Sequence, residues 1–239
     1  MTMTTTAPTG RADSVGDNPD RLARIGGAAA LLAAGTFFYG IAMFATTMSD
    51  YTDPDIEAAQ AVDFVAQNQG ALLAWYLGIF IVFGAALVPL GLALRKRLAE
   101  TPLLADASMV FAAIWATLMF ATGMISNIEI ETVADLATSD PGRAVTVWST
   151  LDAVTNGLGG GNELVGGIWI LLLSIAGLST ARLPRWLNLV GILTAVAGLV
   201  TVVPEFEAAE MVFGLGSIVW FVGVGITLLR DRRVVGAAR

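Results

Sequence analysis

The chain of 239 residues has no cysteine and no histidine, and Lys96 is its only lysine. Without thiols or imidazoles it can form no disulfide, no thiolate nucleophile, no ordinary zinc or copper site and no histidine proton relay. Haem ligation by histidine or cysteine is excluded for the same reason. A retinal-type Schiff base is not expected, because Lys96 lies between Arg95 and Arg97 in a charged loop. We therefore expect no cofactor and no metal site.

Charged residues are also scarce, at 14% of the chain, whereas 56% of residues are hydrophobic and the mean hydropathy is +0.73. Six apolar stretches carry this bias: residues 25–46, 71–94, 107–127, 160–179, 186–203 and 210–229. A helix of ~20 residues, rising about 1.5 Å per residue, crosses a hydrocarbon core of about 30 Å. Lipid also requires each segment to satisfy its own backbone hydrogen bonds. The sequence therefore predicts an all-α, six-helix transmembrane bundle in a lipid bilayer.

Basic residues are distributed unevenly between the two sides of this predicted bundle. Twelve of the thirteen lie on one side: Arg11, Arg21 and Arg24 before the first stretch, Arg95, Lys96 and Arg97 after the second, Arg182 and Arg185 after the fourth, and Arg230, Arg232, Arg233 and Arg239 after the last. Loops rich in arginine and lysine stay in the cytoplasm. We therefore predict a multi-pass protein of the plasma (inner) membrane with both termini cytoplasmic.

The three predicted outer loops are acidic, with Arg143 as their single basic residue. An acidic surface repels nucleic acid, so no nucleic-acid partner is expected. The acids are explained either by a function of the outer face or by a solvated exterior adapted to salt.

The chain ends predict two short tails. Residues 1–20 are polar and rich in Thr, Asp, Gly and Pro, which predicts a disordered cytoplasmic tail. This segment does not resemble a signal peptide, because it contains Asp13, Asp17 and Asp20 and no small-residue cleavage pattern follows the apolar run. Residues 21–233 are predicted to form the six-helix membrane domain, and residues 234–239 a second cytoplasmic tail.

The first two outer loops contain helix-start signals. Asp53-Pro54 and Asp140-Pro141 each place an N-cap acid before a proline at the first helical position. We predict short amphipathic helices over about 54–68 and 141–156. Apolar residues fall on one face of each: Ala58, Ala61, Val62 and Val65 in the first, and Val145, Trp148, Leu151 and Val154 or Thr155 in the second. Such a stripe lies along a membrane surface or on the outer end of the bundle.

Glycines recur seven residues apart in three of the apolar stretches. The pairs are Gly84 and Gly91, Gly191 and Gly198, and Gly216 and Gly223. Seven residues are nearly two helical turns, so each pair lies on one face and allows a neighbouring backbone to approach closely. The pairs predict tight helix packing.

A first candidate site is polar and comprises Asp152, Asn156, Asn162 and Glu163 around the glycines at 157 and 159–161. One helix from 143 to 179 would be about 55 Å long, too long for one crossing, so a break is expected at the glycines. Glu163 then lies in the first turn of the fourth crossing, where an acid is costly unless paired or hydrated. One hypothesis is that Glu163 binds a cation or holds a proton, with Arg143 as the only nearby base in sequence. Simple capping of the helix start is the alternative.

A second candidate site is aromatic. Trp115, Trp169 and Trp220 lie near the midpoints of the third, fourth and sixth stretches. Tryptophan usually lies at the lipid headgroups, and a buried indole N–H requires a partner. The three predict a pocket for an apolar ligand such as a lipid, quinone or carotenoid. The alternatives are bulk packing against the glycine grooves or lipid-facing rings. By contrast, Trp75, Tyr76 and Trp186 lie where interfacial anchors are expected.

The segment Arg182-Leu183-Pro184-Arg185-Trp186-Leu187, followed by Gly191 and Ala197-Gly198-Leu199, supports a resemblance. It resembles a prokaryotic family of multi-pass membrane proteins classed only as a domain of unknown function. These proteins have a Leu-Pro-Arg-Trp-Leu-Gly cytoplasmic turn between their fourth and fifth helices, and here Asn188 stands where the glycine is common. The resemblance implies a six-helix fold and a membrane location, and it implies no activity.

Three functional hypotheses follow. The first is a binder or carrier of a small apolar or cationic ligand, based on the tryptophans and the surroundings of Glu163. The second is a non-catalytic accessory subunit that packs on a membrane-protein partner or on a second copy, based on the glycine grooves. The third is an intramembrane enzyme with Asp152 and Glu163 as a carboxylate pair. It is the weakest of the three, because no nucleophile or metal-binding group accompanies the pair, so no catalytic residue is assigned.

Overall fold

The computed structural model describes residues 19–51, 53, 55–159, 162–206 and 208–230, so both predicted tails lie almost wholly outside it. Every regular element in the described residues is helical, which confirms the all-α prediction. The elements are α1 (Pro19–Phe44), α2 (Ala58–Tyr76), the π-helix η1 (Leu77–Val82), α3 (Phe83–Arg97), α4 (Pro102–Ser139), α5 (Pro141–Gly159), α6 (Asn162–Thr180), α7 (Arg185–Val200), the 3₁₀ helix η2 (Pro204–Phe206) and α8 (Ala209–Arg230).

Six helices form a closed bundle in which each packs against the next: α1, α3, α4, α6, α7 and α8, with α8 returning to α1. Five helical segments are long and apolar enough to cross a membrane, as expected for a multi-pass membrane protein. The sixth, α7, has 16 residues and is shorter than predicted. It ends at Val200, and the chain continues through a short turn into η2.

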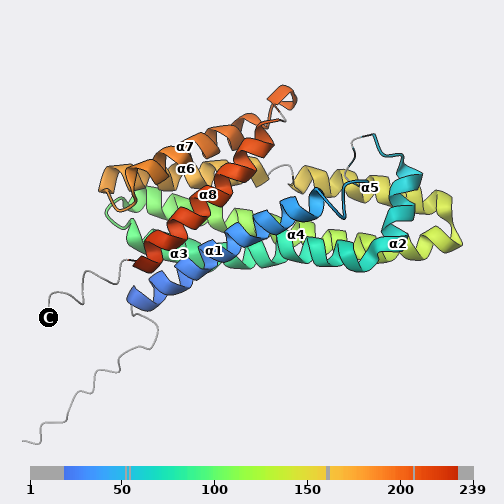
Figure 1. Cartoon of the computed structure of the whole chain (residues 1–239), viewed down its shortest axis with the longest axis horizontal. Helices are drawn as coiled ribbons and strands as arrows, with labels where there is room; N and C mark the ends of the chain where they lie inside the picture. Colours follow the sequence, from blue (N-terminus) through green and yellow to red (C-terminus); the bar gives the residue numbers. More distant parts are fainter. Residues whose placement is uncertain (1–18, 52, 54, 160–161, 207, 231–239) are drawn as a thin grey trace, which may run out of the picture.

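Three helical segments project beyond one end of the bundle and form what we call the extension: α2, residues 128–139 of α4, and α5 (Figure 1). The continuous helical segment 58–97 has 40 residues and α4 has 38. At about 1.5 Å per residue each is nearly twice as long as a crossing requires. The extension has its own apolar core of Met48, Val62, Val65, Leu72, Trp75, Ile130, Val133 and Ala144. We call the bundle end next to the extension the outer end, and the opposite end the inner end.

The second predicted outer helix is present, and the first differs from the prediction. Helix α5 begins at Pro141, as its start signal indicates, and α2 begins at Ala58 instead of Pro54. The carboxylate of Asp53 accepts a hydrogen bond from the amide of Asp55 at 2.9 Å, so this signal forms a turn; residue 54 lies outside the described residues.

The first outer helix was predicted to end at Asn68, and the structure has a kink there. Its backbone is non-helical (φ −122°, ψ 24°), yet the chain continues through α2 into η1 and α3. The predicted apolar stripe explains this arrangement, because Ala61, Val62 and Val65 are buried. Both α2 and α5 pack against α4 at the outer end of the bundle. In Figure 1, α5 runs along the long axis of the molecule, whereas the first part of α2 runs across it.

The predicted glycine grooves are occupied by neighbouring helices. A Cβ added at Gly91 would lie 3.2 Å from the Cβ of Ala112 on α4, and one at Gly84 would lie 3.3 Å from the carbonyl oxygen of Ala116. On α8, a Cβ at Gly223 would lie 2.6 Å from Leu187 of α7. The grooves therefore bring backbones together as predicted.

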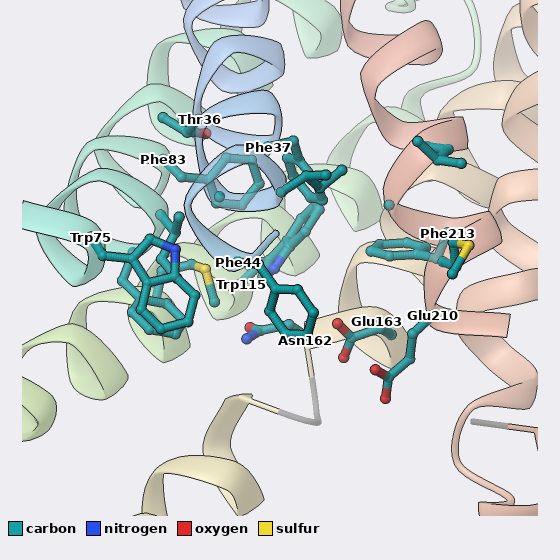
Figure 2. A pocket seen from close by; sticks show the side chains of 18 of the residues that line it. Thr36, Phe37, Phe44, Trp75, Phe83, Trp115, Asn162, Glu163, Glu210 and Phe213 are labelled. Atoms are coloured by element: carbon teal, nitrogen blue, oxygen red, sulfur yellow. The ribbon is translucent and has the colours of Figure 1, made fainter. Parts of the chain in front are cut away.

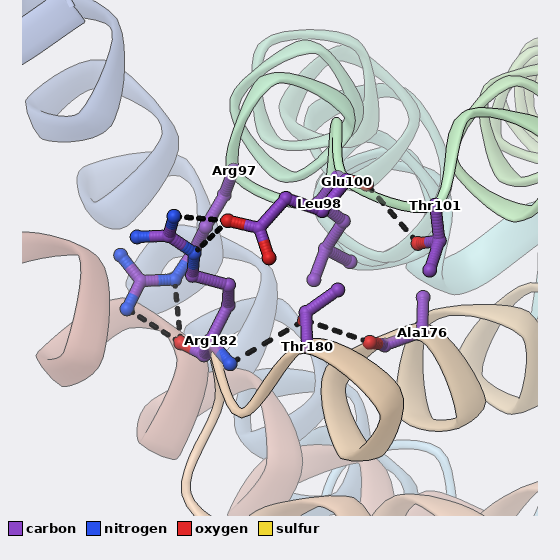
Figure 3. A network of polar contacts seen from close by, with 7 residues as sticks. All are labelled: Arg97, Leu98, Glu100, Thr101, Ala176, Thr180 and Arg182. Atoms are coloured by element: carbon purple, nitrogen blue, oxygen red, sulfur yellow. Dashed lines mark hydrogen bonds and ion pairs between the residues drawn. The ribbon is translucent and has the colours of Figure 1, made fainter.

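At the inner end, polar contacts join the α3–α4 turn to the α6–α7 turn (Figure 3). The guanidinium of Arg97 donates to the carbonyl oxygen of Arg182 at 2.6 and 2.9 Å. The guanidinium of Arg182 donates in turn to the carboxylate of Glu100. Both arginine and glutamate side chains of this ion pair are about half exposed, so the pair contributes little stability, and its role is to fix the two turns relative to each other.

Two features shape the turn that carries the family resemblance: the backbone of Ala181 and the side chain of Asn188. Ala181 ends α6 in the left-handed conformation (φ 53°), which is unusual for a residue with a Cβ. Asn188 is fully buried, and its amide donates to the carbonyl oxygen of Leu183 at 3.2 Å. Its carboxamide oxygen lies where a Cβ on Gly177 would be. Asparagine at this position therefore links the start of α7 to the turn.

A candidate ligand pocket between the outer halves of α1 and α8

Helices α1 and α8 are in close contact near their inner ends. A Cβ added at Gly27 would lie 2.8 Å from Leu229 and 3.1 Å from the carbonyl oxygen of Gly225. One added at Gly225 would lie 2.9 Å from Leu31. The backbones of the two helices therefore touch through glycine, as small-residue interfaces in membranes do.

Near the outer end the space between these helices is a pocket of about 820 Å³. A Cβ added at Gly214, which lines it, would meet no atom of the described residues within 4 Å. The volume matches the range of about 300–1,000 Å³ that is typical of small-molecule sites. The lining comes from five parts of the chain: Thr36, Phe37, Gly40, Ile41 and Phe44 of α1; Trp75, Ile79, Phe80 and Phe83 of α2, η1 and α3; Trp115 and Met119 of α4; Asn162 and Glu163 of α6; and Ala208, Glu210, Met211, Phe213, Gly214 and Leu215 at the start of α8.

Aromatic rings form the deep wall of the pocket. Phe83 stands edge-on to Phe37, with ring centroids 5.2 Å apart, and edge-on to Trp115 at 5.0 Å. Phe213 lies 6.3 Å from Trp115. Edge-to-face contacts at these separations are favourable, so the rings support one another and present a rigid apolar surface.

The pocket opens sideways between α1 and α8. Four of its apolar lining residues are also exposed on the outside of the molecule: Ile41 by 42%, Phe44 by 52%, Met211 by 71% and Leu215 by 52%. An apolar mouth on the side of an apolar bundle faces lipid if the bundle spans a membrane. A ligand could therefore reach the pocket from the bilayer.

Polar groups are concentrated at one end of the pocket, where Figure 2 shows Asn162, Glu163 and Glu210 close together. The Oε2 atom of Glu163 and the Oδ1 atom of Asn162 are buried and have no hydrogen-bond partner among the described residues. Asn162 is 8% exposed. Buried acceptors without donors are costly in a folded protein, so a donor that reached this end of the pocket would be stabilised there.

The packing of Gly198 on α7 positions this polar end. A Cβ at Gly198 would overlap the carbonyl oxygen of Glu163 and would lie 2.6 Å from the ring of Phe213. The glycine therefore brings α7 against the first turn of α6 and against the aromatic wall at once. The groove predicted from the sequence thus helps to build the pocket.

Two indole N–H groups are a second set of unsatisfied polar atoms. Trp75 and Trp115 are 8% and 1% exposed, and neither Nε1 atom has a hydrogen-bond partner among the described residues. Both side chains line the pocket. The pocket therefore has donors on its aromatic side and acceptors at its acidic end.

The structure brings together three of the predicted site residues: Trp115, Asn162 and Glu163 all line the pocket. Trp169 and Trp220 are fully buried behind it. Trp169 stands edge-on to Trp115 at 5.7 Å and to Trp220 at 5.4 Å. These two rings support the pocket wall by packing, and they do not line this pocket.

The other two predicted site residues lie on α5, away from the pocket lining. The amide of Asn156 donates to the carboxylate of Asp152 at 3.0 Å, one helical turn apart. The predicted helix break lies between α5, which ends at Gly159, and α6, which begins at Asn162; the two glycines between them are outside the described residues. Arg143, the expected basic partner of Glu163, lies in the first turn of α5 and does not line the pocket.

Asp152 belongs instead to a polar centre within the extension. The charge of its carboxylate repels that of Glu129 on α4, and Glu129 is buried at 5% exposure. The hydroxyl of Tyr51 accepts a hydrogen bond from the indole of Trp148 at 3.2 Å. Burial raises the pKa of the Tyr51 hydroxyl, against the effect of this hydrogen bond. Burial also raises the pKa of the Asp152 carboxyl, against the hydrogen bond from Asn156.

Sequence reasoning assigned one lining residue to the wrong role. Trp75 was expected to anchor the chain at the membrane interface, whereas it is buried and lines the pocket. The cause is the extension, which covers the outer end of this helix and shields it from the interface. The phenylalanines of the wall were missed because nothing in their spacing separates a pocket wall from core packing.

Comparisons of the chain with protein-family models, with curated proteins and with solved structures find no match. The resemblance of the turn at Arg182–Leu187 to the family described above therefore rests on those residues alone. Any functional argument has to come from the pocket itself.

Proposed function

We propose that this protein is a plasma-membrane protein with both termini in the cytoplasm, and that it binds a small apolar molecule in the pocket between α1 and α8. One observation carries the proposal. The pocket combines a volume of about 820 Å³ and a mouth of exposed apolar side chains with buried polar atoms that have no partner among the described residues. An apolar cavity with a few convergent polar groups is the usual form of a small-molecule site.

The charge pattern supports the orientation. The inner end of the bundle carries the basic turns, including Arg95, Arg97 and Arg182, and such loops stay in the cytoplasm. The pocket residues of α1, α6 and α8 come from the opposite ends of their helices. The pocket then opens into the outer half of the bilayer, and the extension stands outside the cell.

Labelling tests this orientation, because the chain has no cysteine of its own. Single cysteines at Glu57 and Glu131 should react with an impermeant thiol reagent added to intact cells. Cysteines at Lys96 and Arg185 should react only after the membrane is permeabilised. Labelling of all four positions from one side would overturn the six-crossing arrangement.

A side chain placed inside the pocket tests the binding function. Gly214→Leu adds a side chain at a position that lines the pocket and where an added Cβ meets no described atom. Gly35→Leu is the matched control on α1, where an added Cβ likewise meets no described atom and the position does not line the pocket. We expect mass spectrometry to detect an apolar molecule that copurifies with the parent and with Gly35→Leu. Gly214→Leu should lose it while its melting temperature stays within a few degrees of the parent's.

The accessory-subunit hypothesis makes the opposite prediction. It requires a protein partner to remain bound on mild extraction and no small molecule to be recovered from the parent. The enzyme hypothesis gains nothing from the structure, because Asp152 pairs with Asn156 on α5 while Glu163 lines the pocket. The two carboxylates are not placed in one site.

A further inference from the structure

The acidic end of the pocket indicates which charge its ligand has. Among the described residues that line the pocket, Glu163 and Glu210 carry the charged side chains, and none is a lysine or arginine. A carboxylate in an apolar cavity is strongly disfavoured unless a cation or hydrogen-bond donors accompany it. For Glu163, the described lining offers no lysine or arginine, whereas a ligand could bring a positive charge.

We propose that the pocket takes a lipophilic organic cation, with its positive centre against Glu163 and Asn162 and its apolar body along the aromatic wall. This inference rests on the proposed binding function, and it specifies the class of ligand. Both unpartnered atoms at this end, Oε2 of Glu163 and Oδ1 of Asn162, are acceptors, so they match a positive centre or a donor. An anionic ligand would place two like charges together in a medium that screens them poorly.

The aromatic wall fits the same ligand. Trp115 and Phe213 line the pocket on the side of the acidic end, and Phe37 lines it farther from that end (Figure 2). Aromatic faces attract cations, and more strongly where water is excluded. The wall therefore stabilises a diffuse organic cation as well as an apolar body, whereas a neutral ligand gains only the apolar contact.

A metal ion fits the site less well than an organic cation. Among the described residues there is no group of three or more aspartate, glutamate, histidine or cysteine side chains that could hold one. The pocket is also far larger than an ion needs, and most of its lining is apolar. Two carboxylates and one amide would supply only part of the six or more oxygen ligands of a hard metal ion, and water would have to supply the rest.

The test uses three probes of nearly the same shape and different charge: tetraphenylphosphonium, tetraphenylmethane and tetraphenylborate. Binding to the full-length protein in one detergent is measured by equilibrium dialysis, with protein-free micelles as the blank. We expect the cation to bind at least tenfold more tightly than the neutral probe, and the anion to bind more weakly than either. Equal affinity for the cation and the neutral probe in the parent would overturn the inference, and this comparison needs no variant.

A charge-removing variant locates the positive centre. Glu163→Gln should lower the affinity for tetraphenylphosphonium about tenfold and leave the affinity for tetraphenylmethane unchanged. Glu205→Gln is the matched control, because it removes the same charge from an exposed position in η2 that does not line the pocket. An equal loss in both variants would indicate a bulk effect of net charge and would contradict the assignment to Glu163.

The two proposals fail in different ways. If tetraphenylmethane binds and Gly214→Leu prevents it, while charge has no effect on affinity, the pocket is a binding site and the organic-cation inference is wrong. If no probe binds to the parent above the micelle blank, and no copurified molecule is found, the binding function itself is wrong.

Discussion

The inner and outer halves of the α1–α8 interface show two different uses of glycine. In the inner half, a Cβ added at Gly27 or at Gly225 would lie 3.1 Å or less from the backbone of the facing helix, so no side chain fits there. In the outer half, Gly214 lines the pocket, and a Cβ added there would meet no described atom within 4 Å. The same residue type closes one half of the interface and leaves the other half open.

This difference shows that the pocket depends on contacts outside it. The close inner contact fixes α1 against α8, and the aromatic wall of Phe37, Phe83 and Phe213 holds the deep end of the space between them. Protein interiors are close-packed, so an 820 Å³ space persists only where rigid neighbours maintain it. A side chain added in the inner half should therefore lower stability, whereas one added at Gly214 should leave stability nearly unchanged and prevent ligand binding.

The largest expected effect is that of Gly26→Ala. The added Cβ would overlap the Cβ of Ala93 on α3, which cannot move without its backbone, and it would lie 3.5 Å from the carbonyl oxygen of Pro89. We expect a loss of about 3 kcal/mol, at the upper end of the range for overpacking. Thermal unfolding in detergent measures it.

Gly35→Ala is the control on the same helix, where an added Cβ meets no described atom within 4 Å. Alanine has a helix propensity about 1 kcal/mol better than glycine, so this variant should be as stable as the parent or more stable. Equal destabilisation by the two alanines would show that close packing at Gly26 is not what makes its substitution costly.

Next in size is a contrast within the tryptophan row. Trp169 is fully buried and touches Trp115, Trp220 and Phe221, so Trp169→Leu should cost about 2 kcal/mol or more through lost packing and a residual cavity. Trp115→Leu should lower stability less than Trp169→Leu does, and it should lower the affinity for the probe more, because one side of the Trp115 ring borders the pocket. Melting temperature and tetraphenylphosphonium affinity, measured on both variants, check the contrast. Parallel losses of both quantities would show that the row acts as one unit.

Most of the fold could be predicted from the sequence, because the signals were long or chemically specific. Apolar length located the six bundle helices, and the glycine pairs predicted close contacts that Gly84, Gly91 and Gly223 make. The continuity of α2 with η1 and α3 was not predicted. It depends on tertiary packing of the extension against α4, which overrides the local break at Asn68. The π-helix η1, which brings Ile79 and Phe80 to the pocket, has no sequence signal that we recognise.

The candidate site was predicted only in part, for a similar reason. Glu163, Asn162 and Trp115 were identified because each residue is chemically unusual for its place in an apolar segment. Asp152 and Asn156 have the same chemistry, yet they pair locally on α5, and position in sequence did not separate the two cases. The contribution of α1 and α8 to the pocket requires knowledge of which helices are neighbours, and local patterns do not contain it.

A smaller effect is expected at the inner end, where the α6–α7 turn contains the strained residue Ala181. A residue with a Cβ in the left-handed region costs about 1 kcal/mol relative to glycine. Ala181→Gly should therefore raise the free energy of unfolding by up to ~1 kcal/mol and leave probe affinity unchanged, because the turn is at the end of the bundle opposite the pocket. A change in tetraphenylphosphonium affinity would show that the two ends are coupled.

The smallest expected effect, and the one whose sign matters most, is that of Glu163→Gln on the stability of the ligand-free protein. If Glu163 only caps α6, its negative charge favours the helix dipole, and the variant should lose up to ~1 kcal/mol. If Glu163 is instead a ligand-binding carboxylate, its charge lies near that of Glu210 and is not neutralised by a ligand in the ligand-free protein. Removing the charge should then leave stability unchanged or raise it slightly. We expect the second result when melting temperatures are compared with those of Glu205→Gln. Addition of tetraphenylphosphonium should then stabilise the parent and Glu205→Gln by mass action, and should stabilise Glu163→Gln much less. A Glu163→Gln protein that is less stable without the probe and equally stabilised by it would assign Glu163 to capping alone.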